Sequence, residues 1–133
     1  MPVGIVIVSH SRKLAEGVRE MAEQMAGGLI TIRAVGGAAD GSLGTDPGGI
    51  CEALTAADTG DGILVLMDLG SAVMSAETAL ELAGDTLTSR VVLSDAPLVE
   101  GAVIAAVEAS IGGGLDEVAA AALGARSLTK ITH

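Results

Sequence analysis

The sequence contains no phenylalanine, tyrosine or tryptophan. Its hydrophobic core must therefore be built from Val, Ile, Leu, Ala and Met, and its 19 glycines allow secondary-structure elements to approach one another closely. Without aromatic rings the chain cannot offer a surface on which nucleic-acid bases stack. A ligand pocket lined by aromatic side chains is excluded for the same reason.

Basic residues are also scarce. Seven Lys and Arg stand against 17 Asp and Glu, which gives a formal net charge of −10. Such a chain does not neutralise a phosphodiester backbone, so DNA and RNA are not expected as partners. An anionic membrane surface would repel it as well. We interpret the negative charge as a source of solubility rather than as a specific acidic function.

Cysteine and long apolar runs are nearly absent. The single cysteine, Cys51, has no partner for an internal disulfide, which favours a reducing compartment, and we expect the cytoplasm. The longest apolar runs, such as Val3–Val8 and Gly62–Met67, are strand-sized and far below the ~20 residues of a spanning helix. A membrane span is therefore not expected. No basic region precedes Val3, so a signal peptide is not expected either.

Apolar runs and helical periodicities alternate along the 133 residues. The predicted strands are Val3–Val8, Ile30–Val35, Gly62–Met67 and Arg90–Leu93. Helical patterns follow each of them, beginning with Arg12–Met25 and including Pro97–Ala109 and Leu115–Leu123. This alternation predicts the α/β class, an open, mainly parallel β-sheet with helices on both faces, in one domain of residues 1–133. The second strand carries Arg33 on a solvated face and belongs near an edge, but the pattern leaves the strand order open.

The helix periodicities also predict which side chains face the core. In the first helix these are Leu14, Val18, Met21, Ala22 and Met25. In Pro97–Ala109 they are Leu98, Val99, Ala102, Val103, Ala106 and Val107. The C-terminal residues leave two alternatives open, a last strand around Ser127–Ile131 or a frayed tail.

Chemically useful residues follow the two fully apolar strands. Ser9, His10 and Ser11 come directly after the first strand, and Asp68 follows the third. Ligand crevices of such sheets lie beyond the carboxyl ends of the strands, so His10 and Asp68 meet if their strands are neighbours. A carboxylate that accepts the Nδ1–H of histidine leaves the Nε2 lone pair as a nucleophile. Backbone N–H groups near Ser11 and Ser71 would hold an anion there, which suits phosphoryl transfer without a metal.

Simpler interpretations exist for each of these residues. A lone loop histidine is usually a solvated or capping residue, and Asp68 before Leu-Gly-Ser is equally consistent with a turn or cap. The glycine-rich segment Gly36–Gly49 suits a mobile connection and a phosphate cradle equally well. We assign no role to the second histidine, His133. The positions of His10 and Asp68 at strand ends favour the nucleophile.

Several rival sites lack their motifs. The chain has no G-x-x-x-x-G-K-[ST] for a nucleotide-binding P-loop and no G-x-G-x-x-G after the first strand. It also lacks the G-x-S-x-G of many hydrolases. A phosphoaspartate receiver needs an acidic pair after its first strand, where this chain has Ser9 and His10.

The segments IVIVSHSRKLAEGV, SLGTD, GILVLMDLGSAVMSAETALEL and APLVEGAVIAAVEAS carry a family resemblance. They resemble the phosphotransferase subunits of the dihydroxyacetone kinases that use phosphoenolpyruvate, which are mannose-type IIA domains of the sugar phosphotransferase system. The resemblance covers nearly the whole chain in the right order. VSHS combined with LVLMDLGSAVMSAE is specific, whereas VSHS alone is weak. One departure is Asp46-Pro47, where much of the family has a serine after LGT, which removes a hydroxyl contact from that position.

The resemblance implies roles for individual residues. His10 matches the phosphorylated histidine and Asp68 the aspartate that supports it. The segment beside that histidine matches Gly70 and Ser71, which we expect to bind phosphate together with Ser11, Gly44 and Thr45. No cofactor is expected on this chain.

The resemblance also implies partners. The phosphoryl donor is phosphorylated HPr, and the acceptor is ADP, with its Mg²⁺, on a separate nucleotide-binding kinase subunit. Some relatives carry fused HPr-like and enzyme I-like domains, for which 133 residues leave no room, so we expect separate donor proteins. A homodimer is implied as well, in which a strand at Ser127–Ile131 crosses to the partner.

Three alternative functions stay open at this point. One is the same carrier chemistry in a sugar-transport phosphotransferase system. Another is a non-catalytic regulatory module that binds an anion or a partner at the same crevice. A hydrolase that depends on Ser9 or Ser11 is the least favoured.

Overall fold

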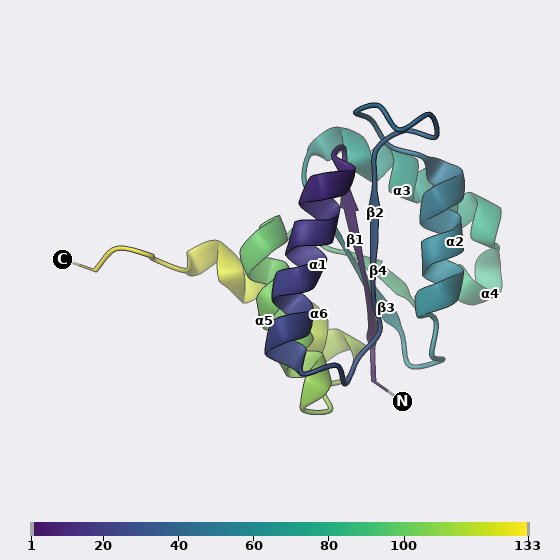
Figure 1. Ribbon diagram of the computed structural model, residues 1–133. Helices are drawn as coiled ribbons and strands as arrows, with labels where there is room; N and C mark the ends of the chain where they lie inside the picture. The colour runs from purple at the N-terminus through teal and green to yellow at the C-terminus, as the bar shows by residue number, and fades with distance from the viewer. Residues whose placement is uncertain (1, 133) are drawn as a thin grey trace.

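Strands and helices alternate along the chain, as Figure 1 shows for the computed structural model, which describes residues 2–132. The strands are β1 (Gly4–Ser9), β2 (Ile32–Gly36), β3 (Ile63–Met67) and β4 (Val91–Leu93). The helices are α1 (Arg12–Ala26), α2 (Pro47–Ala57), α3 (Gly70–Ala83), α4 (Asp85–Thr88), α5 (Leu98–Ser110) and α6 (Leu115–Gly124), followed by the 3₁₀ helix η1 (Ala125–Ser127). The predicted α/β class is confirmed, whereas the short helix α4 was not predicted.

The four strands form one parallel sheet in the order β2-β1-β3-β4. Every residue of β1 and β3 is buried, as expected for the two central strands. β2 lies at an edge and exposes Arg33, which confirms the prediction from its half-solvated pattern. The register pairs Val8 with Met67, so both central strands end at the same level.

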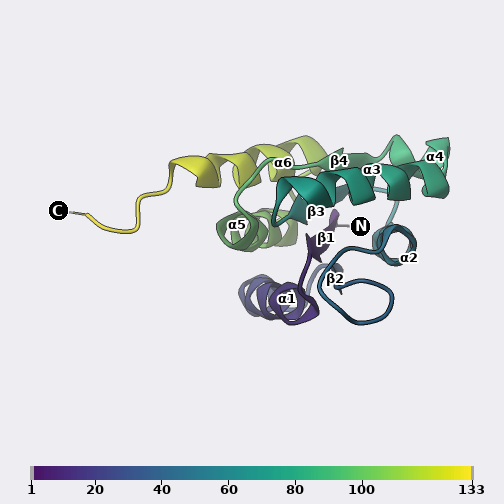
Figure 2. The same ribbon diagram turned by 90° about the horizontal axis from the view of Figure 1, so that it is seen from above.

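Helices cover both faces of the sheet. On one face Ile5, Ile7, Leu64 and Leu66 pack against α1, α5 and α6. On the other face Val6, Val8, Ile63 and Val65 pack against α2 and α3, with Leu87 of α4 beside them. Viewed from above, the two groups of helices lie on opposite sides of the strands (Figure 2). Successive side chains along each central strand thus point alternately into two separate hydrophobic cores, one on each face of the sheet.

The predicted inward faces of α1 and α5 are partly wrong, because small residues rather than large ones face the core. The buried positions are Ala15, Val18, Ala22 and Ala26 in α1, and Gly101, Ala102, Ala105, Ala106 and Ala109 in α5. The exposed apolar side chains on these helices are Leu14, Met21, Met25, Val99 and Val107. Close approach explains the choice: a Cβ at Gly101 would lie 2.9 Å from the Cβ of Ala96 and 3.0 Å from a methyl of Leu66.

The C-terminal tail makes no strand within the described part of this chain. After η1 the backbone is extended and leaves the body of the molecule (Figure 1), with Leu128 and Ile131 exposed. The sequence left a last strand or a frayed tail as alternatives for Ser127–Ile131, and in the single chain this segment is a tail that pairs with no strand. Lys130 forms an ion pair of 3.3 Å with Glu100, and His133 lies outside the described residues. Among residues 2–132, none of the helices combines the length and apolar character needed to cross a membrane.

Candidate functional site

The ends of β1 and β3 lie side by side, and the residues of the candidate site lie at these two ends. The backbone N–H of Asp68 donates to the carbonyl of Val8 at 3.2 Å, which continues the parallel ladder one step beyond the strands. Ser9 follows Ile5 and Ile7 on one face of the sheet, and Asp68 follows Leu64 and Leu66 on the same face. Because side chains opposite each other in a parallel pair share a face, Ser9 and Asp68 become neighbours.

His10 and Asp68 meet, as the sequence predicts. The ring Nδ1 of His10 lies 3.0 Å from Oδ1 of Asp68, and the backbone N–H of His10 donates to Oδ2 at 2.9 Å. The two side chains are 26% and 16% exposed, so the ring stays accessible while its carboxylate partner is more covered. An ionised carboxylate only accepts hydrogen bonds, so Nδ1 carries the proton. The neutral ring then presents its lone pair at Nε2.

The carboxylate of Asp68 accepts four hydrogen bonds. Oδ2 accepts from the Ser9 hydroxyl and the His10 backbone, and Oδ1 accepts from the His10 ring and from the backbone N–H of Leu69 at 2.7 Å. Burial acts to raise the pKa of Asp68, but the hydrogen bonds from His10, Ser9 and Leu69 outweigh it and hold this pKa below its ordinary value. Asp68 is therefore a fixed, ionised acceptor.

The free nitrogen of His10 faces the start of α3. The Ser71 hydroxyl lies 2.7 Å from Nε2 and donates to it, since the other ring nitrogen holds the proton. Gly70 and Ser71 are the first two residues of α3, and no side chain caps this helix end. An anion attached to Nε2 would thus sit beside uncapped N–H groups and the positive end of a helix dipole. This position of Gly70 and Ser71 suits the phosphate binding expected of them.

The other predicted phosphate ligands have different partners. Ser11 is the N-cap of α1, and its hydroxyl accepts from the backbone N–H of Leu14 at 3.2 Å. The N–H of Gly44 donates to the His10 carbonyl at 2.9 Å. The Thr45 hydroxyl is hydrogen-bonded to that of Ser75. Gly44 and Thr45 thus tie the glycine-rich loop to His10 and to α3, which favours a positioning role over a cradle.

Two hydroxyls of the site, those of Ser9 and Ser75, were not among the predicted site residues. The sequence suggests only a hydrolase nucleophile for Ser9, although the period of two along Ile5, Ile7 and Ser9 points its side chain toward the face of Asp68. Ser75 lies one helical turn after Ser71, and no sequence signal marks it because its partner Thr45 is 30 residues away.

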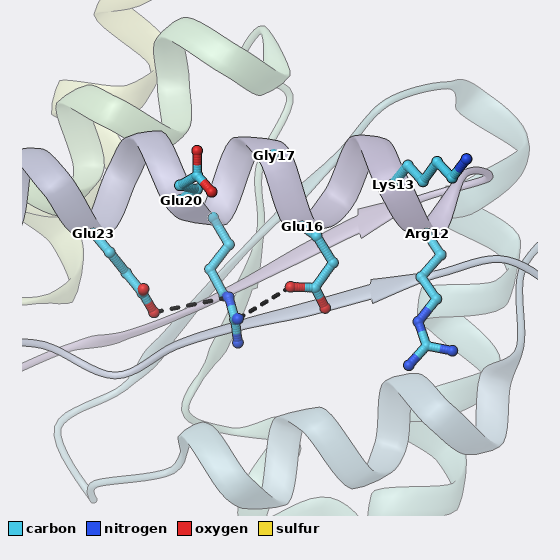
Figure 3. A pocket seen from close by; sticks show the side chains of 7 residues that line it. Arg12, Lys13, Glu16, Gly17, Glu20 and Glu23 are labelled. Carbon is cyan, nitrogen blue, oxygen red and sulfur yellow. Dashed lines mark ion pairs between the residues drawn. The ribbon is translucent and has the colours of Figure 1, made fainter.

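A separate hollow runs along the exposed face of α1 (Figure 3) and contains neither His10 nor Asp68. Its charged side chains come from one helix, and Arg19 pairs with Glu16 at 3.0 Å and with Glu23 at 3.8 Å. These are ion pairs between residues three and four apart, which support the helix rather than a ligand. Within residues 2–132, no three His, Cys, Asp or Glu side chains gather as a metal site would require.

Comparison with known proteins identifies the family. The sequence model of the EIIA-man family, described as the PTS system fructose IIA component, matches residues 4–119. The phosphoryl donor subunit DhaM of the PEP-dependent dihydroxyacetone kinase of Klebsiella michiganensis is 43% identical over 132 residues. That match covers 97% of this chain but only 28% of the relative. The corresponding subunit of dihydroxyacetone kinase 2 of Listeria innocua is 43% identical over 109 residues, which cover 82% of this chain and 87% of the relative.

Solved structures agree with this assignment. The crystal structure of EF1359, a protein of unknown function, is 40% identical with a TM-score of 0.87, and the match covers 99% of this chain and 100% of that one. The mannose/sorbose-specific IIA subunit from Enterococcus faecalis is 26% identical with a TM-score of 0.56, covering 100% of this chain and 97% of that one. The chain therefore belongs to the EIIA-man family, in the branch whose curated members carry the name DhaM.

Proposed function

We propose that this chain is the phosphoryl donor subunit of a dihydroxyacetone kinase that uses phosphoenolpyruvate. His10 accepts a phosphoryl group from the phosphohistidine of HPr and passes it to ADP on a separate kinase subunit. The observation that carries the proposal is the line of contacts from Asp68 through the His10 ring to Ser71. The names of the DhaM relatives support the choice of dihydroxyacetone kinase.

The first transfer uses the lone pair of Nε2. This nitrogen attacks the phosphorus on the donor, the bond from phosphorus to the donor histidine breaks, and that histidine keeps the electron pair. The His10 ring becomes positively charged, and Asp68 stabilises this charge through the Nδ1–H bond of 3.0 Å. The Ser71 hydroxyl leaves Nε2 and turns to a phosphoryl oxygen. In the second transfer an ADP oxygen attacks the phosphorus and the bond from phosphorus to Nε2 breaks. Nε2 keeps the electron pair, so the ring returns to its neutral form.

Radiolabelled phosphoenolpyruvate, supplied with enzyme I and HPr, tests the carrier step. We expect an acid-labile label on the wild-type chain and no label on a His10→Ala variant. A His133→Ala variant is the matched control, because it removes the other histidine of the chain and should keep the full label. Full labelling of His10→Ala would refute the assignment.

A sugar-transport IIA component is the second candidate, and the structural likeness to the mannose/sorbose-specific subunit favours it. The two functions differ in the acceptor. Labelled chain should lose its phosphate to ADP when a dihydroxyacetone kinase subunit is added, and to a IIB domain in the alternative. A non-catalytic regulatory module would carry no covalent phosphate and would keep its function in His10→Gln.

We further propose that the chain works as a cytoplasmic homodimer. The exposed side chains of Met25, Val107 and Ile111 border a groove of about 380 Å³ across α1, α5 and α6, which is lined almost entirely by apolar atoms. A second copy of the chain that packs on this groove would remove these apolar side chains from water. The unpaired tail adds Leu128 and Ile131 to the apolar groups that a second copy would cover.

A further inference from the structure

Ser9 is a polar residue in an apolar layer. It ends β1 on the face that Ile5 and Ile7 bury, and it is 0% exposed. Its hydroxyl donates to Oδ2 of Asp68 at 2.9 Å and accepts from the backbone N–H of Ser11 at 3.0 Å. Burying a hydroxyl is unfavourable unless it is hydrogen-bonded, so a serine here is explained by the groups that it connects.

The Ser9 hydroxyl links the carboxylate to the start of α1. Because it accepts from Ser11 while it donates to Asp68, the first bond polarises the second. Each oxygen of Asp68 has two donors, and Ser9 is the side-chain donor of the oxygen that does not face the His10 ring. Without this hydroxyl, Oδ2 retains only the backbone N–H of His10 among these four bonds, and the carboxylate is freer to rotate.

We propose that Ser9 is a positioning residue for phosphoryl transfer, whose buried hydroxyl fixes the carboxylate plane of Asp68 so that Oδ1 faces Nδ1 of His10. The inference rests on the proposed function of His10 and deepens it. Ser9 acts through Asp68 and touches neither the ring nitrogen that reacts nor the phosphoryl group. Its effect is on the tautomer and orientation of the ring.

Ser94 offers a comparison within the same chain that tests whether the role of Ser9 is purely structural. Ser94 comes directly after the last residue of β4, is 8% exposed, and its hydroxyl accepts from the backbone N–H of Ala96 at 3.1 Å. Both serines thus make the same bond to the residue two positions later, at the turn between a strand and a helix. Only Ser9 also donates to Asp68. Ser94→Ala therefore removes the turn bond alone, and Ser9→Ala removes the turn bond and the link to the carboxylate.

Three measurements on the full chain separate these roles. We expect Ser9→Ala to lower the maximal rate of His10 phosphorylation by phospho-HPr about tenfold with little change in KM. In spectra of chain labelled with ¹⁵N-histidine, the Nδ1-protonated tautomer should lose its dominance. The hydroxyl also contributes to the lowered pKa of Asp68, so the acidic limb of the pH–rate profile should move to higher pH in Ser9→Ala.

Two further variants complete the design. Ser9→Thr keeps a hydroxyl at the same position and should restore the tautomer and the acidic limb. Ser94→Ala should match the wild type in all three measurements. If Ser9→Ala fails to fold, Ser9→Cys replaces it, because a thiol of nearly the same size is only a weak donor and should show the same changes.

The inference is overturned if Ser9→Ala behaves as wild type, or if Ser94→Ala changes the three measurements to the same extent. Failure of the proposed function looks different: wild-type chain would then take up no phosphate from HPr. The ¹⁵N spectra need no phosphate, so they decide the role of Ser9 in either case.

Discussion

Asp68 decides which ring nitrogen of His10 carries the proton, because a carboxylate offers acceptors only. Each of its oxygens accepts two hydrogen bonds, from Ser9 and the His10 backbone on one side and from Leu69 and the His10 ring on the other. An amide in its place would turn an NH₂ group toward a backbone N–H on either side. Asparagine is therefore a poor substitute at this position even though it has the same shape.

The same hydrogen bonds make stability depend on pH. They lower the pKa of Asp68 below its ordinary value, so the unfolded chain takes up the proton first as the pH falls. The stabilisation is complete above the ordinary pKa of aspartate and is lost as the pH falls through the lowered value. We expect the free energy of unfolding, measured with urea across acidic pH, to fall more steeply for wild type than for Asp68→Asn. Equal slopes for wild type and Asp68→Asn would contradict the argument.

At the scale of elements, β2 and α1 approach so closely that only glycine fits between them. A Cβ at Gly36 would lie 2.4 Å from the Ser11 carbonyl oxygen and 2.6 Å from the Cα of Arg12. These atoms are backbone at the start of α1, next to His10, so they cannot move aside without displacing the site. The approach therefore couples the packing of an edge strand to the position of His10.

Gly36→Ala should accordingly destabilise the fold by about 2 kcal/mol and slow the phosphorylation of His10. Gly17→Ala is the control, since Gly17 lies in the exposed middle of α1, where an added Cβ would meet no atom within 4 Å beyond the backbone of its own helix. That substitution should stabilise the chain by roughly 0.5–1 kcal/mol, because alanine loses less backbone entropy in a helix. Thermal or urea unfolding of both variants measures the change in the free energy of unfolding. An unchanged free energy of unfolding in Gly36→Ala would show that α1 moves aside at little cost.

The elements differ in how far their sequence predicts them. Apolar runs predict the buried strands β1 and β3, and with them the ends that carry His10 and Asp68. Periodicity does not identify the inner face of α5, because its Ala and Val positions alternate and hydrophobicity alone favours burying Val99 and Val107. Close packing selects the small residues instead. The partners of Ser9 and Thr45 depend on contacts between distant segments, which no local pattern contains.

At the scale of the whole molecule, the small buried residues of α1 and α5 leave larger apolar side chains on the surface. Met25, Val107 and Ile111 border one continuous groove. The net charge of −10 makes two copies repel each other, so association needs enough apolar contact to outweigh that repulsion. Apolar burial contributes roughly 25 cal/mol per Å², and the exposed tail enlarges the area available. We expect the proposed homodimer to cover both the groove and the apolar side chains of the tail.

Removal of residues 127–133 tests whether the tail takes part. We expect the wild-type chain to sediment as a dimer at micromolar concentration and the truncated chain to dissociate at concentrations at least tenfold higher, because Leu128 and Ile131 no longer bury apolar surface. Lys130→Ala is the control, since an ion pair with an exposed lysine contributes little, and it should leave the association unchanged. If the truncated chain dimerises as well as wild type, the tail takes no part and the two copies associate through the groove alone. A wild-type chain that sediments as a monomer would refute the homodimer.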